Sequence, residues 1–485
     1  MSQFQAILEL IDKYIWGVPL IVLIIGTGLL LTIRLAGVQF SNLRRAFYYV
    51  FHSETEGEGD VSSFGALSTA LAATVGTGNM VGVATAVVTG GAGALFWMEL
   101  AACVGMATTY AEGLLSIKYR VQSENGGHKL GGPFYYIQNG MGERWKWLAK
   151  LFAFFGCVAG VMGIGTITQV NSIVSSMNMV FDPNNENIAF SIGSNDYSWA
   201  TTIGAVVVAV CTALVVIGGI QRIATFASFV VPAMILGYVL MGTALIIYNW
   251  RHIPDAIVEI VQSAFGLRAV AGGALGSMML ALQMGVARGI FSNEAGLGSA
   301  PIAASAATTK EPVRQGLISM TGPFLDTIVI CTMTGLSIVI TGAHKAGVEG
   351  VAVTIKAFGG GLPWGEHWGA IVVCVCLTIF AYTTILGWDF YGERCLEYLT
   401  NGRMKIVKAY RWIYVLAVLI GPFLTLSFVW TIADIFNAAM AFPNLVALLA
   451  LSGVVVKETR SYFDRMKTGE LHDEWKEHKL AKKQK

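Results

Sequence analysis

"ATVGTGNMVG", residues 73–82, lies in the middle of an apolar run that extends from Phe64 to Phe96. The stretch contains three glycines, two threonines and an asparagine. A glycine in a helix interior costs about 1 kcal/mol relative to alanine, and an unpaired backbone group in lipid costs more. We therefore expect a broken helix, whose freed backbone groups face protein, water or a ligand. The alternative is that Gly78 and Gly82, four residues apart, mark close packing of an intact helix.

The whole chain has the composition of an integral membrane protein. Of its 485 residues, 55% are hydrophobic and 13% are charged, and the mean hydropathy is +0.62. Soluble domains carry roughly 25% charged residues. Apolar runs of about 20 residues, long enough to cross a bilayer, recur along nearly the whole sequence. The first run, 15–33, is of spanning length and shows no cleavage site, so we expect it to be retained.

These runs predict an all-α membrane protein with eleven transmembrane helices. The predicted spans are residues 15–36, 62–90, 92–118, 147–178, 199–219, 226–248, 272–305, 315–342, 367–395, 411–431 and 433–456.

Lysine and arginine collect in three segments, 118–150, 393–411 and the tail after Val456, whereas residues 181–198 contain neither. Basic loops lie on the cytoplasmic side of a membrane. With eleven spans, the three basic segments fall on one side. The N-terminus is therefore expected outside and the C-terminus in the cytoplasm. We expect the basic tail to be solvated and attracted to anionic lipid.

A second polar interruption, "MGVARGIFSNEAGLGSAP" at residues 284–301, follows about 210 residues after the first. If the first span is peripheral, the other ten divide into two sets of five, and each set begins with an interrupted helix. Such a pair of interrupted spans indicates the binding site of a secondary transporter. The predicted parts are a peripheral helix and linker, a first repeat, an extracellular connection, a second repeat and a basic tail. Their bounds are 1–61, 62–248, 249–271, 272–457 and 458–485.

A break in the middle of the membrane creates its own chemistry. It exposes amides with partial positive charge, which suit a carboxylate, and carbonyls that suit Na⁺ or an ammonium group. Thr74 and Asn79 add side-chain oxygens at the first break. One break could thus hold both ends of a zwitterion with a cation beside it.

Four longer motifs carry a family resemblance. They are "VGTGNMVGVATA" (75–86), "GGPFYYIQNGMG" (131–142), "GVARGIFSNEAGLGSAPIAA" (285–304) and "TTILGWDFYGERCLEYL" (383–399). They closely resemble the alanine or glycine:cation symporter family of bacteria and archaea, and the match covers nearly the whole chain. The resemblance implies a sodium-coupled importer of small amino acids in the cytoplasmic (inner) membrane, with two inverted five-helix repeats of the leucine-transporter fold.

The resemblance also implies roles for individual residues. The amides of Thr77 and Gly78 would take the substrate carboxylate. The full set of substrate-binding candidates is Gly76, Thr77, Gly78, Asn79, Gln169, Met284 and Trp388, in which Met284 and Trp388 narrow the pocket to small side chains. The candidate sodium ligands are Ala72, Val75, Thr383 and Thr384, while Thr74 and Asn79 match ligands of the fold's other sodium site.

Each of these roles has a structural alternative. The Thr383 and Thr384 hydroxyls could bond back to carbonyls one turn earlier in their own helix. Gln169 could bond to neighbouring helices rather than to substrate. Six ionisable residues lie at or near membrane depth, namely Glu99, Glu112, Arg288, Glu294, Asp326 and Asp389. We expect Arg288 to pair with one of these carboxylates as a gate or brace.

Other classes of function find little support in the sequence. There is no HExxH, no GxxxxGK[ST] and no intramembrane His or Cys pair, so we expect neither an enzyme nor a transition-metal site. No cofactor besides the coupling ion and no nucleic-acid partner is implied. A channel would be expected to show one symmetric filter segment rather than two unlike breaks. The nearest alternative is a proton-coupled transporter or exchanger of the same fold. All seven histidines fall in loops or tails, which argues against it.

Overall fold

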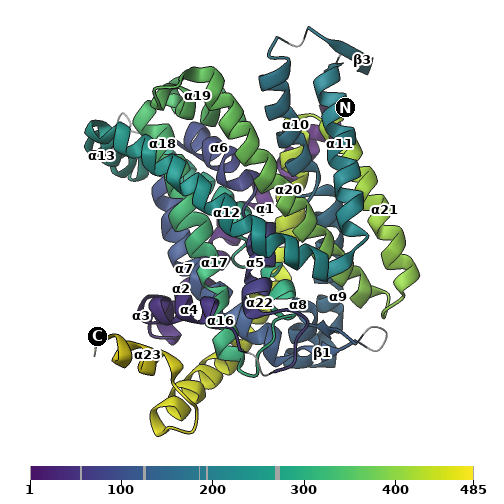
Figure 1. Cartoon of the computed structure of the whole chain (residues 1–485), viewed down its shortest axis with the longest axis vertical. Coiled ribbons are helices and arrows are strands. Elements are labelled where there is room, and N and C mark those ends of the chain that lie inside the picture. The colour runs from purple at the N-terminus through teal and green to yellow at the C-terminus, as the bar shows by residue number, and fades with distance from the viewer. Residues whose placement is uncertain are drawn as a thin grey trace.

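The computed structural model describes residues 2–54, 57–123, 127–184, 186–192, 195–267 and 273–483. The described chain is almost entirely helical (Figure 1). Two short antiparallel hairpins are formed by β1 (Val121–Gln122) with β2 (Lys129–Leu130), and by β3 (Ile188–Ile192) with β4 (Asn195–Ser198).

Nine helical stretches in the described residues are long and apolar enough to cross a membrane, and a bent pair makes up to ten. The nine contain α7 (Gly93–Lys118), α9 (Lys146–Met162) with α10 (Ile167–Phe181), α11 (Trp199–Val216), α12 (Gly219–Tyr248), α14 (Ala274–Asn293), α16 (Pro312–Ser319) through α17 (Thr321–Pro323) and η5 (Phe324–Cys331) to α18 (Thr332–Thr341), α20 (Gly365–Leu399), α21 (Met404–Ile420) and α22 (Leu426–Thr468). The protein is therefore a multi-pass membrane protein. The predicted span 15–36 corresponds to α2 (Val18–Arg34), which at 17 residues is shorter than these, so the count of eleven stays a prediction.

Shorter elements complete the chain. They are α1 (Ser2–Ile15), α3 (Val38–Ser41), α4 (Leu43–Phe51), α8 (Pro133–Tyr135), η2 (Tyr136–Gly140), η3 (Glu143–Trp145), η4 (Trp250–His252), α13 (Ile253–Ala264), η6 (Ala343–Lys345), α19 (Val351–Gly361), η7 (Gly421–Phe423) and α23 (Glu474–Lys483).

The bent pair is the first interruption predicted from the sequence. The helix α5 (Ser63–Thr74) begins with a cap, because the Ser62 hydroxyl accepts the Gly65 N–H at 3.0 Å. It ends at Thr74, where Val75 and Gly76 leave the helical conformation. One turn, η1 (Thr77–Asn79), leads into α6 (Val81–Gly90), and the two helical halves are bent by 59°. The helix is thus broken at the glycine-rich stretch.

The second interruption is also a break. The helix α14 ends at Asn293, and Glu294 follows in the left-handed conformation with φ +57°. Gly296 and Gly298 have φ +89° and +80°, which side chains other than glycine rarely adopt. Helix resumes only as the short α15 (Ala300–Ala304).

One predicted boundary between spans needs correction. The last two spans were expected to meet between residues 431 and 433, but α22 runs unbroken through this point. The chain turns instead at Gly421–Thr425, where Pro422 favours an end to α21. The predicted connection 249–271 contains a helix, α13, and residues 268–271 of it lie outside the described residues. The predicted basic tail from 458 is also ordered into helix, as the end of α22 and as α23.

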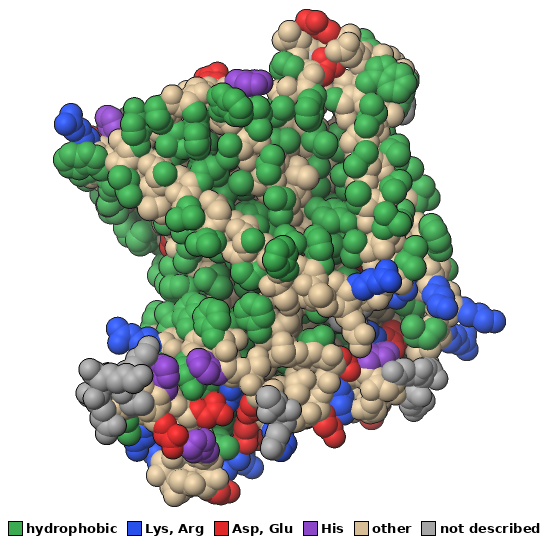
Figure 2. Space-filling view, viewed as in Figure 1, with side chains coloured by type: hydrophobic (Ala, Val, Ile, Leu, Met, Phe, Trp, Pro, Cys, Tyr) green, Lys and Arg blue, Asp and Glu red, His purple; other side chains and the backbone are tan. Residues whose placement is uncertain are grey.

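The surface matches a membrane protein. Figure 2 shows hydrophobic side chains over the upper and middle parts of one face, whereas charged side chains gather toward the lower end. On α12, the large apolar side chains of Phe229, Leu236 and Leu240 are exposed, as expected for a helix in contact with lipid.

The three basic segments share one side of the molecule. Lys118 pairs with Glu458 at 2.8 Å, and His128 lies 3.2 Å from Glu397. These contacts join the ends of α7, α20 and α22, whereas β3 lies at the opposite end of the molecule from β1 (Figure 1). The prediction that the basic segments lie together agrees with this arrangement.

Candidate functional site

The two helix breaks meet at Gly78. A Cβ placed on Gly78 would lie 2.9 Å from the Cα of Ser292 and 3.3 Å from the Phe291 ring. Real Cβ contacts are essentially never below 3.0 Å, so only glycine permits this approach. Gly82 is different, because its nearest neighbour would be the Thr77 carbonyl oxygen at 4.0 Å. The first interruption is therefore both a helix break and a site of close packing. Of the two glycines, only Gly78 packs closely against another helix.

Side-chain oxygens satisfy the amides that the first break exposes. The Gly76 N–H donates to Oδ1 of Asn79 at 2.8 Å, and the Thr77 N–H donates to Oε1 of Gln169 at 3.0 Å. Gln169 comes from α10, and its Nε2 donates to the Ile164 carbonyl at 2.8 Å. The Gln169 oxygen thus occupies a position where a hydrogen-bond acceptor, such as a carboxylate oxygen, can bind the Thr77 N–H.

Thr384 of α20 also contacts the first break. Its Oγ1 lies 3.2 Å from the Val75 carbonyl oxygen and 3.1 Å from the Phe380 carbonyl oxygen in its own helix. A Cβ on Gly76 would overlap this hydroxyl. The contact places two oxygens, one from the broken helix and one from α20, at hydrogen-bonding distance.

The other proposed sodium ligands lie nearby but bond differently. The Thr383 hydroxyl donates to the Phe380 carbonyl at 2.8 Å, and that of Thr74 donates to the Leu71 carbonyl at 3.4 Å. Both hydroxyls thus bond back within their own helices. Ala72 is buried in the last turn of α5.

A buried carboxylate joins the two breaks. Asn79 Nδ2 donates to Oδ1 of Asp326 at 2.7 Å, and the Ser292 hydroxyl donates to its Oδ2 at 2.8 Å. Thr327 donates to the same oxygen at 2.9 Å. Asp326 lies in η5, a π-helical stretch, and π-helical turns are frequent at functional sites. Sequence reasoning counted Asp326 among the ionisable groups at membrane depth but gave it no role at the site.

Trp388 connects α20 to the second break. Its indole Nε1 donates to Oε1 of Glu294 at 2.7 Å, and the Ser299 hydroxyl donates to Oε2 of the same carboxylate at 2.5 Å. Both Trp388 and Glu294 are fully buried. Trp388 therefore holds Glu294, the left-handed residue that follows α14.

Met284 lies away from the meeting point of the breaks. A Cβ on Gly90, the last residue of α6, would lie 2.9 Å from the Cβ of Met284. Met284 precedes Ser292 by eight residues, a rise of about 12 Å along α14. The structure does not bring Met284 to Gly78, where Phe291 and Ser292 lie instead.

Arg288 pairs with a carboxylate that the sequence analysis did not consider. Its two terminal nitrogens donate to the two oxygens of Asp434 on α22, at 3.0 and 2.7 Å. The guanidinium also lies 4.7 Å from the Trp430 ring centroid. The expected partners, Glu99, Glu112, Glu294, Asp326 and Asp389, were therefore wrong. Asp434 escaped notice because the predicted boundary of the last two spans placed it at a helix start.

Cavities lie on both sides of the breaks. On the side where α6 ends, a cavity of about 330 Å³ is lined by Asp12, Arg288, Glu349, Trp430 and Asp434, among others. On the side where α5 begins, a cavity of about 20 Å³ is lined by residues that include Thr74, Asn293, Gln315 and Ser319. The smaller cavity has room for about one water molecule.

The Val75 carbonyl and the Thr384 hydroxyl form a pair of neutral oxygens rather than soft ligands. The cysteines are free, and no group of three or more His, Cys, Asp or Glu in the described residues is placed to hold a metal ion. Hard cations such as Na⁺ bind to carbonyl and hydroxyl oxygens of the kind that Val75 and Thr384 present.

Comparison with known proteins places this geometry in context. A model of the sodium:alanine symporter family matches residues 1–476. An uncharacterized transporter of Haemophilus influenzae is 53% identical, over 96% of this chain and 97% of the relative. The sodium/alanine symporter AgcS of Methanococcus maripaludis is 43% identical, over 95% of this chain and 97% of the relative.

A solved structure extends the comparison to the fold. The crystal structure of MhsT in complex with L-phenylalanine aligns with a TM-score of 0.54 at 11% identity, covering 83% of this chain and 98% of that chain. The likeness shows a shared fold, which is the leucine-transporter fold that the sequence motifs implied.

Proposed function

Because the chain belongs to the sodium:alanine symporter family, we propose that it imports alanine, glycine or both together with Na⁺ by alternating access. The observation that carries the proposal is the meeting of the two broken helices at Gly78 and Ser292, beside the oxygen pair of Val75 and Thr384. Members of this family are symporters rather than enzymes.

The proposed substrate site is built on the first break. The carboxylate of the amino acid binds the amides of Thr77 and Gly78. At present Gln169 Oε1 accepts the Thr77 N–H, so Gln169 turns as substrate binds and presents its Nε2 to the carboxylate. Gly76 and Asn79 hold the shape of the break, and Trp388 and Phe291 limit the space for the side chain.

The proposed sodium site lies at the same break, where a Cβ on Gly76 would meet both Thr384 and Gln169. The Val75 carbonyl and the Thr384 hydroxyl are its central ligands, because the structure already places them together. The Ala72 carbonyl and the Thr383 hydroxyl complete it after a rotation of Thr383 away from Phe380. Thr74 and Asn79 remain candidates for a second sodium site. Asn79 would have to exchange its bonds to Gly76 and Asp326 for the ion.

Alternating access follows from the proposed repeat structure. Residues 62–248 and 272–457 form two inverted five-helix repeats, preceded by a peripheral part at 1–61, joined by 249–271 and followed by the tail at 458–485. Sodium favours the arrangement open to the outside, and the bound amino acid then favours closure. The N-terminus lies outside and the C-terminus inside a bacterial or archaeal cytoplasmic membrane, since the basic segments share one side.

Counterflow in proteoliposomes tests the proposal. Purified protein is reconstituted with internal unlabelled alanine or glycine, and uptake of the radiolabelled amino acid is followed with Na⁺, Li⁺, K⁺ or a pH gradient supplied in turn. The proposal predicts uptake that requires Na⁺. Uptake driven by a pH gradient without Na⁺ would instead favour the proton-coupled transporter or exchanger. Sodium flux that is indifferent to alanine would favour a channel.

A further inference from the structure

The cytoplasmic end of the site is closed by two paired segments. Residues 57–61 lead into α5, and residues 305–309 lead away from α15. The Asp60 N–H donates to the Ala306 carbonyl at 2.8 Å, and the Thr308 N–H donates to the Val61 carbonyl at 2.8 Å. A Cβ on Gly59 would overlap the backbone of Thr308. The pairing therefore ties together the inner halves of both broken helices.

Arg120, just after α7, clamps this pairing. Its guanidinium donates to the carbonyls of Ala307 at 2.8 Å, Thr309 at 2.9 Å and Glu58 at 2.7 Å. The segments 57–61 and 305–309 can move apart only if these bonds break.

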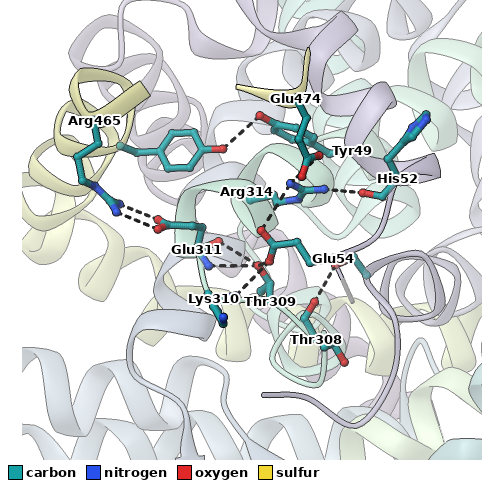
Figure 3. A network of polar contacts seen from close by, with 12 residues as sticks. Tyr49, His52, Glu54, Thr308, Thr309, Lys310, Glu311, Arg314, Arg465 and Glu474 are labelled. Carbon is teal, nitrogen blue, oxygen red and sulfur yellow. Dashed lines mark hydrogen bonds and ion pairs between the residues drawn. The ribbon is translucent and has the colours of Figure 1, made fainter. Parts of the chain in front are cut away.

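The end of α22 binds residue 311, in the chain that follows the paired segment 305–309. The two terminal nitrogens of Arg465 donate to the two carboxylate oxygens of Glu311, at 2.9 and 2.7 Å (Figure 3). The Glu54 carboxylate accepts the Thr309 hydroxyl at 2.7 Å and the Lys310 N–H at 3.1 Å. Residues 309–311 are thus bound from both the chain before α5 and the chain after the last span.

Arg314 is the centre of the network (Figure 3). It is 5% exposed and lies 3.2 Å from Glu474 of α23 and 3.5 Å from Glu54. Its guanidinium lies 4.2 Å from the Tyr49 ring centroid, and the Tyr49 hydroxyl is 3.2 Å from that of Tyr462 on α22. A buried arginine needs such partners, because an uncompensated buried charge is costly.

The helix α23 folds back onto α4. Asp473, just before it, accepts a hydrogen bond from Arg45 at 3.1 Å. The rings of Trp475 and His478 lie 5.4 and 4.9 Å from that of Tyr48. The C-terminal segment is therefore docked on the protein, in contrast to the solvated tail expected from its basic composition.

We propose that the C-terminal segment, residues 457–483, is a latch that stabilises the arrangement closed to the cytoplasm. It binds Arg45 of α4, in the chain before the first broken helix, and Arg314 of α16, in the chain after the second. It therefore holds together the chain on either side of the paired segments 57–61 and 305–309. Opening requires Arg465 to leave Glu311 and Glu474 to leave Arg314. The latch thereby disfavours openings that are not driven by substrate. This role rests on the proposed alternating access.

Hydrogen–deuterium exchange of the full-length protein in lipid nanodiscs, without alanine or Na⁺, tests the latch. The informative amides in peptides covering residues 57–61 and 305–309 are those of Asp60, Val61 and Thr308, which donate to carbonyls of the opposite segment. Arg465→Gln should speed their exchange about two- to fivefold, as expected for loss of one partly exposed ion pair. The exchanged pair Arg465→Glu with Glu311→Arg should restore the slow exchange.

Lys467→Gln is the matched control. Lys467 is 77% exposed at its side chain and pairs at 3.1 Å with Asp464 of the same helix, so its loss should leave the peptides unchanged. The latch would be overturned if these amides exchanged at the wild-type rate in Arg465→Gln. It would also be overturned if they exchanged no more slowly in the double variant Arg465→Glu with Glu311→Arg than in Arg465→Gln. Because the exchange needs no substrate, a failure of sodium-coupled uptake would refute the proposed function while leaving this result standing.

Discussion

Gly78 of the first broken helix lies against Ser292 of the second, so closely that a Cβ on the glycine would come within 2.9 Å of the serine Cα. The residues are far apart in the chain, and each belongs to a segment whose composition alone predicts a break. Their contact makes the two breaks one structural unit. The Asp326 carboxylate strengthens it, since it accepts hydrogen bonds from Asn79 beside Gly78 and from Ser292 itself.

Gly78→Ala should strongly weaken alanine binding, because the added methyl group would force the two breaks apart. Radiolabelled alanine binding to purified protein measures the effect, after confirmation that the variant reaches the membrane. Gly82→Ala provides the control, since its methyl group would meet nothing closer than 4.0 Å. Wild-type binding by Gly78→Ala would show that the contact is not needed for the site.

Thr384→Ala should raise the Na⁺ concentration for half-maximal uptake by about tenfold, as expected for the loss of roughly 1.4 kcal/mol of ion binding. Thr384→Ser retains the hydroxyl that contacts Val75 and should stay near the wild-type value. An unchanged sodium dependence in Thr384→Ala would remove this residue from the ion site.

Asp326→Ala should abolish transport and lower the stability of the protein. It removes the carboxylate that accepts from the Asn79 amide and the Ser292 hydroxyl, at a cost of about 1–3 kcal/mol. Asn79 retains its bond to the Asp326 carbonyl, and Ser292 retains its contact with the Cys331 sulfur. Thermal unfolding in detergent and alanine uptake measure the two effects. Asp326→Asn keeps one acceptor oxygen and should be less severe. Full activity in Asp326→Ala would contradict a role in joining the breaks.

Features of this site that depend on neighbouring residues can be predicted from the sequence, whereas contacts between residues distant in the sequence cannot. The breaks themselves are local, so glycine, proline and polar residues within apolar runs suffice to predict them. Asn79 and Asp326 are separated by 247 residues, and the rotation and register of two helices decide whether they meet. No local pattern in one sequence specifies that register. Asp326 could be noticed only as a carboxylate at membrane depth.

The same reasoning explains the differences at Met284, Arg288 and the tail. The sequence places Met284 in the interrupted run, but its height along α14 puts it against Gly90. Asp434, the partner of Arg288, lies well inside α22 and not at the helix start that the predicted boundary gave it. The basic composition of the tail indicated lipid contact, whereas its acidic and aromatic residues pack on α4 and α16.

Phe291→Ala should therefore broaden the range of amino acids that compete with alanine, because the Phe291 ring lies at the meeting point of the breaks. Met284→Ala, on the same helix but beside Gly90, should change the competition profile less. Competition of uptake by a series of neutral amino acids of increasing size measures both. A wider profile in Met284→Ala and not in Phe291→Ala would support the pocket role predicted for Met284 and contradict one for Phe291.

Asp434→Ala should lower the unfolding temperature markedly, because it leaves the Arg288 guanidinium largely buried without its paired carboxylate, at a cost of about 3 kcal/mol. Lys345→Gln removes the ion pair between the exposed Lys345 ammonium and Glu259, which are 2.8 Å apart, and should lower the free energy of unfolding by less than about 1 kcal/mol. Thermal unfolding of the purified variants compares the two. Equal unfolding temperatures would show that the Arg288–Asp434 pair does not brace α14 against α22.

The coupling between the two ligands is measured most directly by the affinity of purified protein for alanine with and without Na⁺. If Val75 and Thr384 hold the ion on the same break that binds the amino acid, saturating Na⁺ should tighten alanine binding by about tenfold or more. Alanine should tighten Na⁺ binding by the same factor, and Thr384→Ala should remove the effect. An alanine affinity that is equal with and without Na⁺ in the wild-type protein would contradict the account.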